Sequence, residues 1–396
     1  MPIGDNKGGF IPVGVTIQED SGKWNRATVM QAEGAGTWPK PPFAGGELWM
    51  WGRNAFGQLG QGNTTEYSSP VQVGALTTWM NGACSNYYGT LTVTSGGAAW
   101  SWGAGVSGQL GQGNTTYYSS PVQIGSLTDW LELSAGFYGP NGGVKTDGTL
   151  WVWGRGSYGA LGLGNTTNYS SPKQVGALTT WLNFAAGYSY GGAVKTDGTL
   201  WAWGNNTDGQ LGQNNTTVYS SPVQVGALTD WLKIACNYRH MGSVKTDGTL
   251  WMWGRNSSGE LGQGNTTIQS SPVQVGALTD WSDLVCGAAF TLALKTDGTM
   301  WGFGKNNVGM LGQNNTTSYS SPVQVGVLTT WLELGAGLYN SAARTTDKTL
   351  YAWGQGSNGQ TGHGDTTNRS TPTQVGALTT WESIMVTRYW MGGIKS

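Results

Sequence analysis

The chain has 396 residues, of which 10% are charged, and its net charge is -1, while it contains 67 glycines and 22 tryptophans. This composition is typical of a turn-rich, aromatic-rich protein and lacks the positive charge that nucleic-acid-binding proteins usually carry, so we expect no nucleic-acid partner. No stretch approaches the roughly 18 apolar residues of a membrane-spanning helix, and the start, MPIGDNKGGFIPVGV, does not form an export signal. We therefore expect no membrane span and no signal peptide.

Residues 1–45 differ from the rest of the chain. They contain five of the 13 prolines, balanced charges and none of the pattern that follows. We predict an extended N-terminal arm with little core of its own, which orders only on a partner and is a possible anchor to a larger assembly. The run SGKWNRATVMQAE, with Ser21 as its cap, predicts a short helix within the arm.

Residues 46–396 consist of seven copies of one pattern. A Trp-Gly pair recurs at intervals of 51, 51, 50, 50, 50 and 50 residues, and Phe303-Gly304 replaces it in the sixth copy. The tryptophans of the other six pairs are Trp51, Trp102, Trp153, Trp203, Trp253 and Trp353. Each copy contains four short runs rich in β-branched and aromatic residues, such as WLKIAC, GSVKT, TLWMWG and PVQVG, separated by Gly, Asn, Asp, Ser and Pro. Four strands per copy are predicted.

The second and third runs are joined by Asp-Gly, at residues 147–148, 197–198, 247–248 and 297–298. This pair favours a two-residue hairpin turn, because such turns need positive φ angles. Asp347-Lys348 takes the same place in another copy, where we expect strain or a different turn. The two tryptophans of LWMWG alternate onto one face, so each sheet has a flat apolar surface that a neighbouring sheet must cover.

The ends of the repeats indicate how the last sheet is completed. The chain ends with GGIKS, which supplies a second strand, and the matching third strand is the run GGELWMW at residues 45–51. A ring leaves no flat sheet surface exposed, whereas a linear stack leaves two. We predict an all-β fold, a seven-bladed β-propeller of four-stranded blades, closed by pairing N-terminal and C-terminal strands in one blade.

At this point the sequence resembles a known family. The unit at residues 231–265 is similar to the repeat of the regulator of chromosome condensation family; it reads WLKIACNYRHMGSVKTDGTLWMWGRNSSGELGQGN. The features that carry the resemblance are the small-residue region with its Cys, the His before the second strand, the Asp-Gly turn, the Trp-Gly pair and the Gly-Glu-Leu-Gly. The resemblance covers about residues 46–396 and implies the propeller fold. Members of this family serve as nucleotide-exchange factors, enzyme inhibitors and interaction platforms, so the resemblance implies binding rather than one activity.

Few residues could carry chemistry. Only His240 and His363 offer imidazoles, and neither has the paired His, Cys or carboxylate spacing of a metal or nucleophile site, so we expect no enzyme activity, no metal and no cofactor. The GQLGQGNTT loop lacks the Gly-Lys-Ser/Thr of a phosphate loop. We expect the asparagine of each Asn-Thr-Thr triplet to order its loop by bonding to nearby backbone.

Two further repeated positions have structural interpretations. Cysteine alternates with alanine five residues after a tryptophan, which predicts free thiols in small core sites at Cys84, Cys236 and Cys286. Lysine recurs before the Asp-Gly turn, where we expect a solvated edge that discourages strand addition, at Lys145, Lys195, Lys245 and Lys295.

The loops of a four-stranded meander alternate between two faces. The Asp-Gly turns and the Gly-Ala-Leu-Thr linkers lie on one face and are nearly identical between copies, so we call it the copied face. Loops between the first and second strands, and between the third and fourth, lie on the opposite face and differ, so we call it the varied face. Relaxed exposed loops would carry small polar residues. The varied loops instead contain the following predicted binding residues: Tyr87, Tyr88, Phe137, Tyr138, Tyr188, Tyr190, Tyr238, Arg239, His240, Phe290, Tyr339, Asn340, Arg388, Tyr389 and Trp390.

Tyrosine, tryptophan and arginine dominate binding hot spots, which favours a binding face. Packing of some of these aromatic residues in the central channel is the alternative. The first functional hypothesis is a bacteriophage virion component, a tail, fibre or decoration protein located in the virion and made in the host cytoplasm. Its residues 1–45 would join other virion proteins, and its varied face would bind a host-surface glycan or protein. A soluble cytoplasmic protein-protein interaction platform is the second hypothesis, and a secreted inhibitor or lectin-like module is the third.

Overall fold

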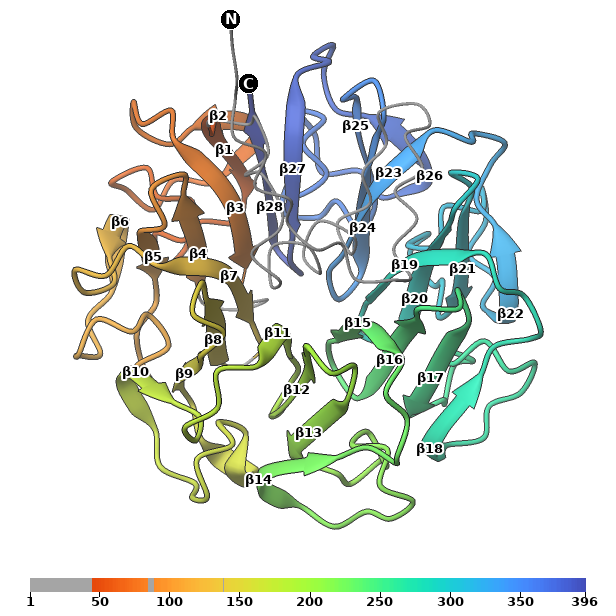
Figure 1. Cartoon of the computed structure of the whole chain (residues 1–396). Helices are drawn as coiled ribbons and strands as arrows, with labels where there is room; N and C mark the ends of the chain where they lie inside the picture. Colours follow the sequence, from red (N-terminus) through yellow and green to blue (C-terminus); the bar gives the residue numbers. More distant parts are fainter. Residues whose placement is uncertain (1–44, 85–88, 138) are drawn as a thin grey trace, which may run out of the picture.

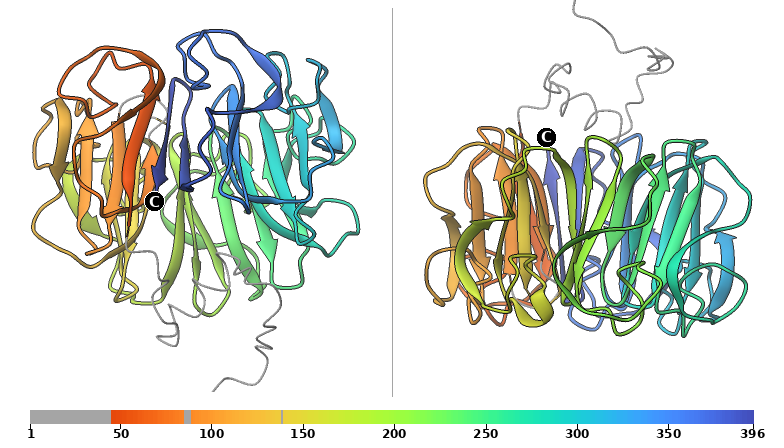
Figure 2. Two further views of the ribbon diagram at one scale, coloured as in Figure 1. Left: turned by 90° about the horizontal axis from the view of Figure 1, so that it is seen from above. Right: turned by 60° about the horizontal axis from the view of Figure 1, so that its bottom comes forward.

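The computed structural model of the chain describes residues 45–84, 89–137 and 139–396. The strands form seven four-stranded antiparallel sheets, arranged around a central axis (Figure 1). From the side, the strands run roughly along that axis, so their connections gather at two opposite ends of the ring (Figure 2). The predicted seven-bladed β-propeller is thus confirmed. The predicted helix near Ser21 lies outside the described residues.

We number the blades along the chain. Blade 1 contains β3 (Trp79–Cys84), β4 (Gly89–Thr94), β5 (Ala99–Gly103) and β6 (Tyr118–Gln123). Blade 2 contains β7 (Trp130–Ala135), β8 (Pro140–Lys145), β9 (Leu150–Gly154) and β10 (Tyr169–Gln174), with the 3-10 helix η1 (Ser157–Gly159) in its last loop. Blade 3 contains β11 (Trp181–Ala186), β12 (Tyr190–Lys195), β13 (Leu200–Gly204) and β14 (Tyr219–Gln224).

The other blades repeat this order. Blade 4 contains β15 (Trp231–Cys236), β16 (His240–Lys245), β17 (Leu250–Gly254) and β18 (Gln269–Gln274). Blade 5 contains β19 (Trp281–Cys286), β20 (Phe290–Lys295), β21 (Met300–Gly304) and β22 (Tyr319–Gln324). Blade 6 contains β23 (Trp331–Ala336), β24 (Asn340–Thr345), β25 (Leu350–Gly354) and β26 (Arg369–Gln374). Blade 7 contains β27 (Trp381–Val386), β28 (Trp390–Lys395), β1 (Glu47–Gly52) and β2 (Tyr67–Gln72).

Blade 7 closes the ring. Its strand order is β2-β1-β28-β27, and β1 pairs with β28 so that Leu48 lies opposite Ile394 and Glu47 opposite Lys395. The first and last colours of the chain accordingly lie side by side in Figure 1. The predicted closure by N-terminal and C-terminal strands is confirmed.

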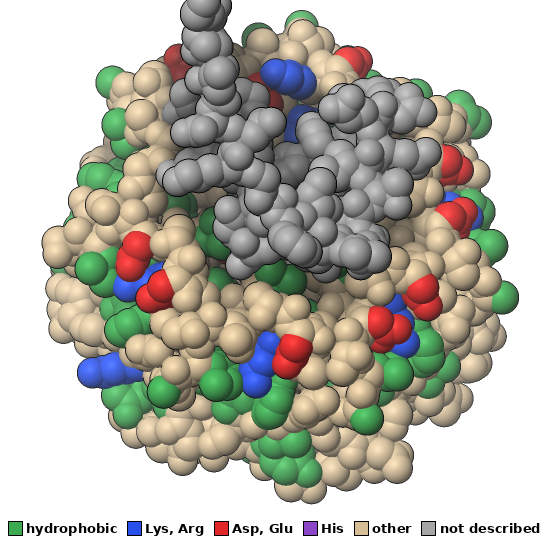
Figure 3. Space-filling view, viewed as in Figure 1, with side chains coloured by type: hydrophobic (Ala, Val, Ile, Leu, Met, Phe, Trp, Pro, Cys, Tyr) green, Lys and Arg blue, Asp and Glu red, His purple; other side chains and the backbone are tan. Residues whose placement is uncertain are grey.

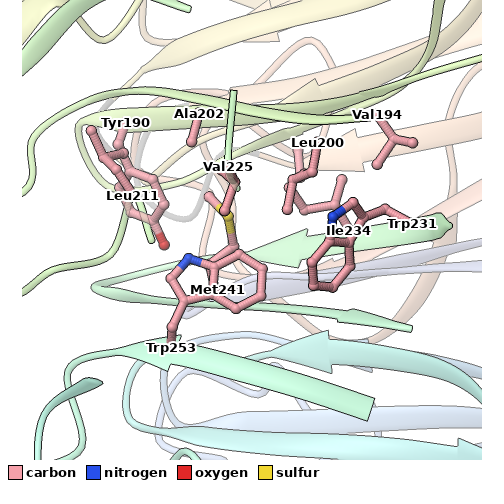
Figure 4. Packing of buried hydrophobic residues seen from close by; sticks show 11 residues of the cluster. Tyr190, Val194, Leu200, Ala202, Leu211, Val225, Trp231, Ile234, Met241 and Trp253 are labelled. Atoms are coloured by element: carbon pink, nitrogen blue, oxygen red, sulfur yellow. The ribbon is translucent and has the colours of Figure 1, made fainter. Parts of the chain in front are cut away.

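The core lies between the blades. Between blades 3 and 4, Tyr190, Leu200 and Leu211 of blade 3 pack with Met241 and Trp253 of blade 4 (Figure 4). The indole Nε1 of Trp253 donates to the carbonyl oxygen of Gln210 in the preceding blade at 3.0 Å. The same bond to a preceding blade is made by Trp51, Trp102, Trp153, Trp203 and Trp353. Each of these tryptophans therefore packs between two blades and also hydrogen-bonds one blade to the other, which explains why the residue recurs.

The Asp-Gly turns have the predicted geometry. Gly148, Gly198, Gly248 and Gly298 have φ angles from +76° to +78°, and a Cβ at Gly148 would approach the Thr179 carbonyl oxygen to 2.2 Å. The Gly148 carbonyl oxygen accepts from the amide of Trp181, so this turn also joins the next blade. Lys348 adopts φ +64°, the strained conformation expected for a non-glycine residue there.

The recurrent lysines do not form a solvated edge, so that prediction is wrong. Lys145, Lys195, Lys245 and Lys295 are between 4% and 8% exposed. Each ammonium lies over two tryptophan rings: Lys245 Nζ is 5.1 Å from the Trp231 ring and 4.6 Å from the Trp251 ring. The alkyl stem covers flat indole while the charge is stabilised by the ring faces. The lysines thus belong to the packing of the copied face.

Two other predictions are confirmed. The amide of Thr65 donates to Asn63 Oδ1 at 2.8 Å, and the asparagines of five more triplets accept the same bond, so these residues do order their loops. Cys236 and Cys286 are free thiols as predicted; Cys286 is buried in the core, at 4% exposed, whereas Cys236 is only partly buried. The side chain of Cys84 lies outside the described part of the structure.

Candidate interaction face

Backbone bonds place the two kinds of varied loop at the same end of the ring. The amide of Arg53 donates to the Tyr389 carbonyl at 2.9 Å, that of Arg255 to the Arg239 carbonyl at 3.0 Å, and that of Gln355 to the Tyr339 carbonyl at 2.8 Å. In each pair the residue that follows the third strand is joined to the residue that precedes the second strand. In these blades the two kinds of varied loop therefore lie side by side at the same end of the ring.

Five of the predicted binding residues are not on this surface. Tyr190, His240, Phe290, Asn340 and Trp390 each begin a second strand, and each is 0% exposed. The Tyr190 hydroxyl donates to the His240 carbonyl of the next blade at 2.6 Å. The expectation that these side chains are displayed to a partner is thus corrected, because they fill the junctions between blades.

The His240 imidazole is held in a dry interior. Its Nε2 lies 3.1 Å from Thr291 Oγ1 of the next blade. Burial lowers the pKa of His240 to about 3, because the charged imidazolium loses its hydration there. The ring is therefore neutral at physiological pH and is not available to a ligand at the surface.

A second group of predicted residues closes the ring axis at the varied face. The Phe137 ring stacks on Tyr188 at 5.4 Å and meets the Tyr238 ring edge-on at 5.9 Å, while Tyr188 and Tyr238 are 5.0 Å apart. Phe137 comes from blade 2 and Tyr238 from blade 4, and residues of non-adjacent blades meet only near the axis. Ala288 and Leu338 are buried in the same axial cluster, and Tyr339 packs against it. The predicted alternative, packing in the channel, therefore applies to Phe137, whereas Tyr188 and Tyr238 remain partly exposed.

Cations lie over the partly exposed tyrosines. The Arg239 guanidinium is 5.4 Å from the Tyr238 ring and 6.0 Å from Tyr188, and its Nη1 is 2.9 Å from Asp208 Oδ2. A hydrogen bond from the guanidinium and the negative charge of Asp208 raise the pKa of Arg239 against the effect of burial. Such cation-π contacts hold a charged group in place while leaving part of it in water.

A longer series of the same contacts crosses blades 7, 6 and 5. Arg53 and Arg388 both lie over the Tyr389 ring, at 4.9 and 4.6 Å. Arg388 is also 5.1 Å from the Tyr339 ring, which Lys305 approaches to 5.7 Å. We call these five residues the cation-tyrosine row. All five are partly exposed, so the row is a surface that a partner can reach.

Sequence reasoning missed Arg53, Lys305 and Asp208. All three belong to the loop between the third and fourth strands, which differs from copy to copy and contains none of the predicted binding residues. The signal was available: the position directly after the Trp-Gly or Phe-Gly pair is cationic in four copies, at Arg53, Arg155, Arg255 and Lys305. The predicted residues Tyr87, Tyr88 and Tyr138 lie outside the described residues.

The opposite, copied face looks different. Neighbouring basic and acidic side chains occur at intervals around it (Figure 3). The lysines that precede the Asp-Gly turns form ion pairs with N–O distances of 3.2 to 3.3 Å, in the pairs Lys145–Asp129, Lys245–Asp230 and Lys295–Asp280. Across residues 45–84, 89–137 and 139–396, no group of three or more His, Cys, Asp and Glu could hold a metal ion. The helical content of that same part of the chain includes nothing long and apolar enough to cross a membrane.

Comparison with sequence families gives two matches. The model for the RCC1-like domain matches residues 142–393, and the model for the regulator of chromosome condensation (RCC1) repeat matches residues 45–91 and 96–138. Together the two matches span the repeats, including the copies in blades 1 and 2.

Curated relatives resemble part of the chain. It is 32% identical over 167 residues to human E3 ubiquitin-protein ligase HERC2, which is 41% of this chain and 3% of the ligase. It is 31% identical over 137 residues to ultraviolet-B receptor UVR8 of Arabidopsis thaliana, 34% of this chain and 31% of the receptor. It is 36% identical over 133 residues to the X-linked retinitis pigmentosa GTPase regulator of Canis lupus familiaris, 33% of this chain and 13% of that protein. The matched region is thus less than a third of each relative.

Solved structures share the whole ring. The chain superposes on human WBSCR16 with a TM-score of 0.78 at 19% identity, covering 88% of this chain and 98% of that one. It superposes on Prp20p of Saccharomyces cerevisiae with a TM-score of 0.77, covering 88% and 92%. A structure of Kap60 bound to yeast RCC1 (Prp20) gives 0.79, covering 97% of both chains. At 19% identity this likeness establishes the fold alone.

Proposed function

The chain belongs to the RCC1-like domain family, and from this premise we propose that it is a protein-interaction platform whose varied face holds a protein partner. Catalytic roles of longer relatives are not part of the proposal, because the matched region is at most 31% of the relatives named above. Platform proteins need a rigid scaffold and a surface that differs from one member to another. The propeller supplies both.

One observation carries this proposal. The seven copies agree in the residues that pack the blades and differ on the varied face, where partly exposed Arg side chains lie over partly exposed Tyr rings. Tyrosine and arginine give large contact areas and directed hydrogen bonds at protein interfaces. The rigid blades beneath them hold these side chains in place before a partner arrives, which lowers the entropic cost of binding.

The similar structures agree with a protein partner. The structure of Prp20p was reported together with its binding properties to Gsp1p and histones, and yeast RCC1 was solved with Kap60 bound. These are protein ligands of propellers with the same architecture. We do not carry the individual partners over, since the identity is 19%.

The proposal is tested by site-specific photo-crosslinking in cells. A photoreactive phenylalanine analogue replaces Tyr339 on the varied face or exposed Leu228 on the copied face, and crosslinked proteins are identified by mass spectrometry. We expect a discrete protein partner to be captured from position 339 and not from position 228. Capture only from position 228 would place the interface on the copied face and contradict the proposal.

The virion hypothesis remains a prediction that these relatives do not favour, because those named above are a ligase, a receptor and a GTPase regulator. It includes a mounting role for residues 1–45, an arm of which the structure describes only the last residue. Sedimentation of a native lysate distinguishes the two: an interaction platform sediments as a free chain or a small complex. Recovery in a much heavier particle, lost when residues 1–45 are deleted, would support the virion hypothesis instead.

A further inference from the structure

Within the described residues, the cations that lie over tyrosine rings of the varied face fall into two classes that differ in their counter-charge. Arg239, which lies over two tyrosines, is paired with Asp208 at 2.9 Å. Arg388 also lies over two tyrosines, Tyr339 and Tyr389, yet among the described residues no carboxylate oxygen comes within 4.0 Å of it or of Arg53 or Lys305. The same chain thus contains an arginine over two tyrosine rings once with a paired carboxylate, at Arg239, and once without, at Arg388.

The position that supplies the carboxylate to Arg239 is acidic in one copy of the repeat alone, that of blade 3. Asp208 stands in the last loop of blade 3, five residues after Trp203, and its equivalent in blade 6, five residues after Trp353, is Asn358. Gln360, two residues further on, donates its amide to the Arg388 carbonyl at 3.3 Å, so this loop adjoins the row. The loop next to Arg388 therefore has a neutral residue at the position where Asp208 neutralises Arg239.

The unpaired cations share tyrosine rings in pairs. Arg53 and Arg388 contact the same Tyr389 ring, and Arg388 and Lys305 contact the same Tyr339 ring. Because each pair shares one ring, its two cations are at most about 11 Å apart, which is comparable to the Debye length of about 8 Å at physiological ionic strength, so their repulsion is only partly screened. Arg388 Nε is also buried without a hydrogen-bond partner among the described residues. An incoming anion relieves this repulsion and supplies an acceptor.

We propose that the cation-tyrosine row is a carboxylate-binding site that takes an acidic segment, rich in Asp or Glu, of the protein partner. This inference rests on the proposed function and names the chemistry of the partner. Guanidinium groups bind carboxylates through paired, charge-assisted hydrogen bonds, and the flanking tyrosines supply apolar area and hydroxyl groups. Asp208 on Arg239 is the built-in precedent for such a carboxylate.

A protein segment fits the row better than a nucleic acid does. The row contains three cations, whereas the whole chain has a net charge of -1, so there is no extended positive field to attract a polyanion. The row is also short, and it spans neighbouring loops of three blades around the axis. A few carboxylates in sequence are enough to neutralise it.

The test uses the full chain and three fluorescein-labelled probes: hexaglutamate, hexaglutamine and a single-stranded DNA of the same charge as hexaglutamate. Binding is measured by fluorescence anisotropy at low salt and at about 0.15 M salt. We expect hexaglutamate to bind more tightly than either other probe, and to weaken as salt is added. Equal binding of the two peptides, no binding of hexaglutamate, or tighter binding of DNA would overturn the proposal.

Variants locate the site. Arg388→Gln is expected to weaken hexaglutamate binding about tenfold, the value of a charge-assisted bond. Asn358→Asp places a fixed negative charge beside the row without touching the core, and it is expected to weaken binding as well. The matched control is Arg239→Gln, whose cation is already paired with Asp208, and it is expected to change binding by less than about twofold. Equal losses in Arg388→Gln and Arg239→Gln would show that the row has no special role.

The outcome also separates this inference from the proposed function. If the partner is captured at position 339 but hexaglutamate does not bind, the varied face is an interface of different chemistry and only the inference fails. If the partner is captured only at position 228, the interface is on the copied face and the proposed function fails, whatever the peptide does.

Discussion

The two faces of the propeller use one kind of contact for opposite purposes. On the copied face, Lys245 is 6% exposed, lies over two tryptophans and is paired with Asp230 at 3.3 Å. On the varied face, Arg388 lies over two tyrosines, is partly exposed, and no described carboxylate lies within 4.0 Å of it. A cation over aromatic rings is thus a structural element where the chain supplies its counter-charge, and a binding element where it does not.

The largest expected effect is a difference in unfolding free energy between variants of two adjacent residues of the varied face. Trp390 is 0% exposed whereas Tyr389 is partly exposed. Trp390→Ala is expected to lower the free energy of unfolding by about 3–5 kcal/mol, because it leaves a large cavity between blades. Tyr389→Ala is expected to lower it by less than about 1 kcal/mol. Urea denaturation followed by tryptophan fluorescence measures both, and equal losses would contradict the division into buried and displayed residues.

The next effect is a pH dependence of stability that comes from His240, a buried residue beneath the varied face. The folded state holds the pKa of His240 at about 3, below the ordinary value near 6.5. The unfolded chain therefore binds a proton first as pH falls, and stability present above about pH 6.5 is lost progressively toward pH 3, at up to about 1.4 kcal/mol per pH unit. His240→Phe, the residue found at position 290, is expected to remove this part of the slope.

The measurement is urea denaturation of both proteins at several pH values between 7 and 4, compared as a difference. Carboxylates titrate in the same way in the two proteins, so their contribution largely cancels. A difference that stays constant over this range would mean that His240 does not remain neutral in the folded state.

A smaller effect tests the contrast between the two faces directly. Lys245→Met keeps most of the stem but removes the ammonium over Trp231 and Trp251, and it is expected to cost about 1–2 kcal/mol of unfolding free energy. Arg388→Gln on the varied face is expected to change stability by less than about 0.5 kcal/mol. Thermal denaturation of both variants checks this, and a larger loss for Arg388→Gln would reverse the assignment of roles.

One buried carboxyl group, that of Glu260, offers a stabilising substitution with an effect of similar size. Glu260 is 0% exposed and occupies a position where Gln58, Gln109, Gln210 and Gln360 stand in other copies. Burial raises the pKa of Glu260, so the folded state is penalised increasingly as pH rises from the ordinary carboxyl pKa toward this raised value. Glu260→Gln is expected to gain about 1 kcal/mol at neutral pH, and the gain should disappear in acid below the ordinary carboxyl pKa. A gain that is independent of pH would contradict this origin.

The smallest expected effect restores a missing pair on the copied face. Lys145, Lys245 and Lys295 have an aspartate from the preceding linker, whereas Lys195 has Thr180 at that position. Burial lowers the pKa of Lys195. Thr180→Asp is expected to add about 0.5 kcal/mol of stability, less at high salt. The control is Thr330→Asp, because the matching residue there is Thr345 rather than lysine and no gain is expected.

The fold could be predicted almost completely from the sequence because its determinants repeat. Seven Trp-Gly or Phe-Gly pairs fixed the number of blades, the Asp-Gly pairs fixed the hairpins, and the matching ends of the chain predicted the pairing of β1 with β28. The first two signals are local, and the third follows from matching each end of the chain to the same repeat.

The site was predicted less well, for a geometric reason. An aromatic residue at the boundary of a varied loop can end the loop or begin the next strand, and Tyr190, Phe290 and Trp390 proved to be the first residues of buried strands. Aromatic side chains suit both a binding loop and a tight junction between blades, so composition could not separate the two. The cation-tyrosine row was missed because its members come from three blades, and only the closed ring brings them together.

The pairing of β1 with β28 has a consequence for how the protein is made. Blades 1 to 6 are each built from consecutive residues and can assemble while the chain is still being synthesised, whereas β1 and β2 must wait for residues 381–395. Until then, the open edge of β1 and the apolar sides of the unclosed ring are exposed to other chains, which makes this stage the most prone to aggregation. A circularly permuted gene that begins in another linker would make a different blade the last to be completed, without altering the finished ring.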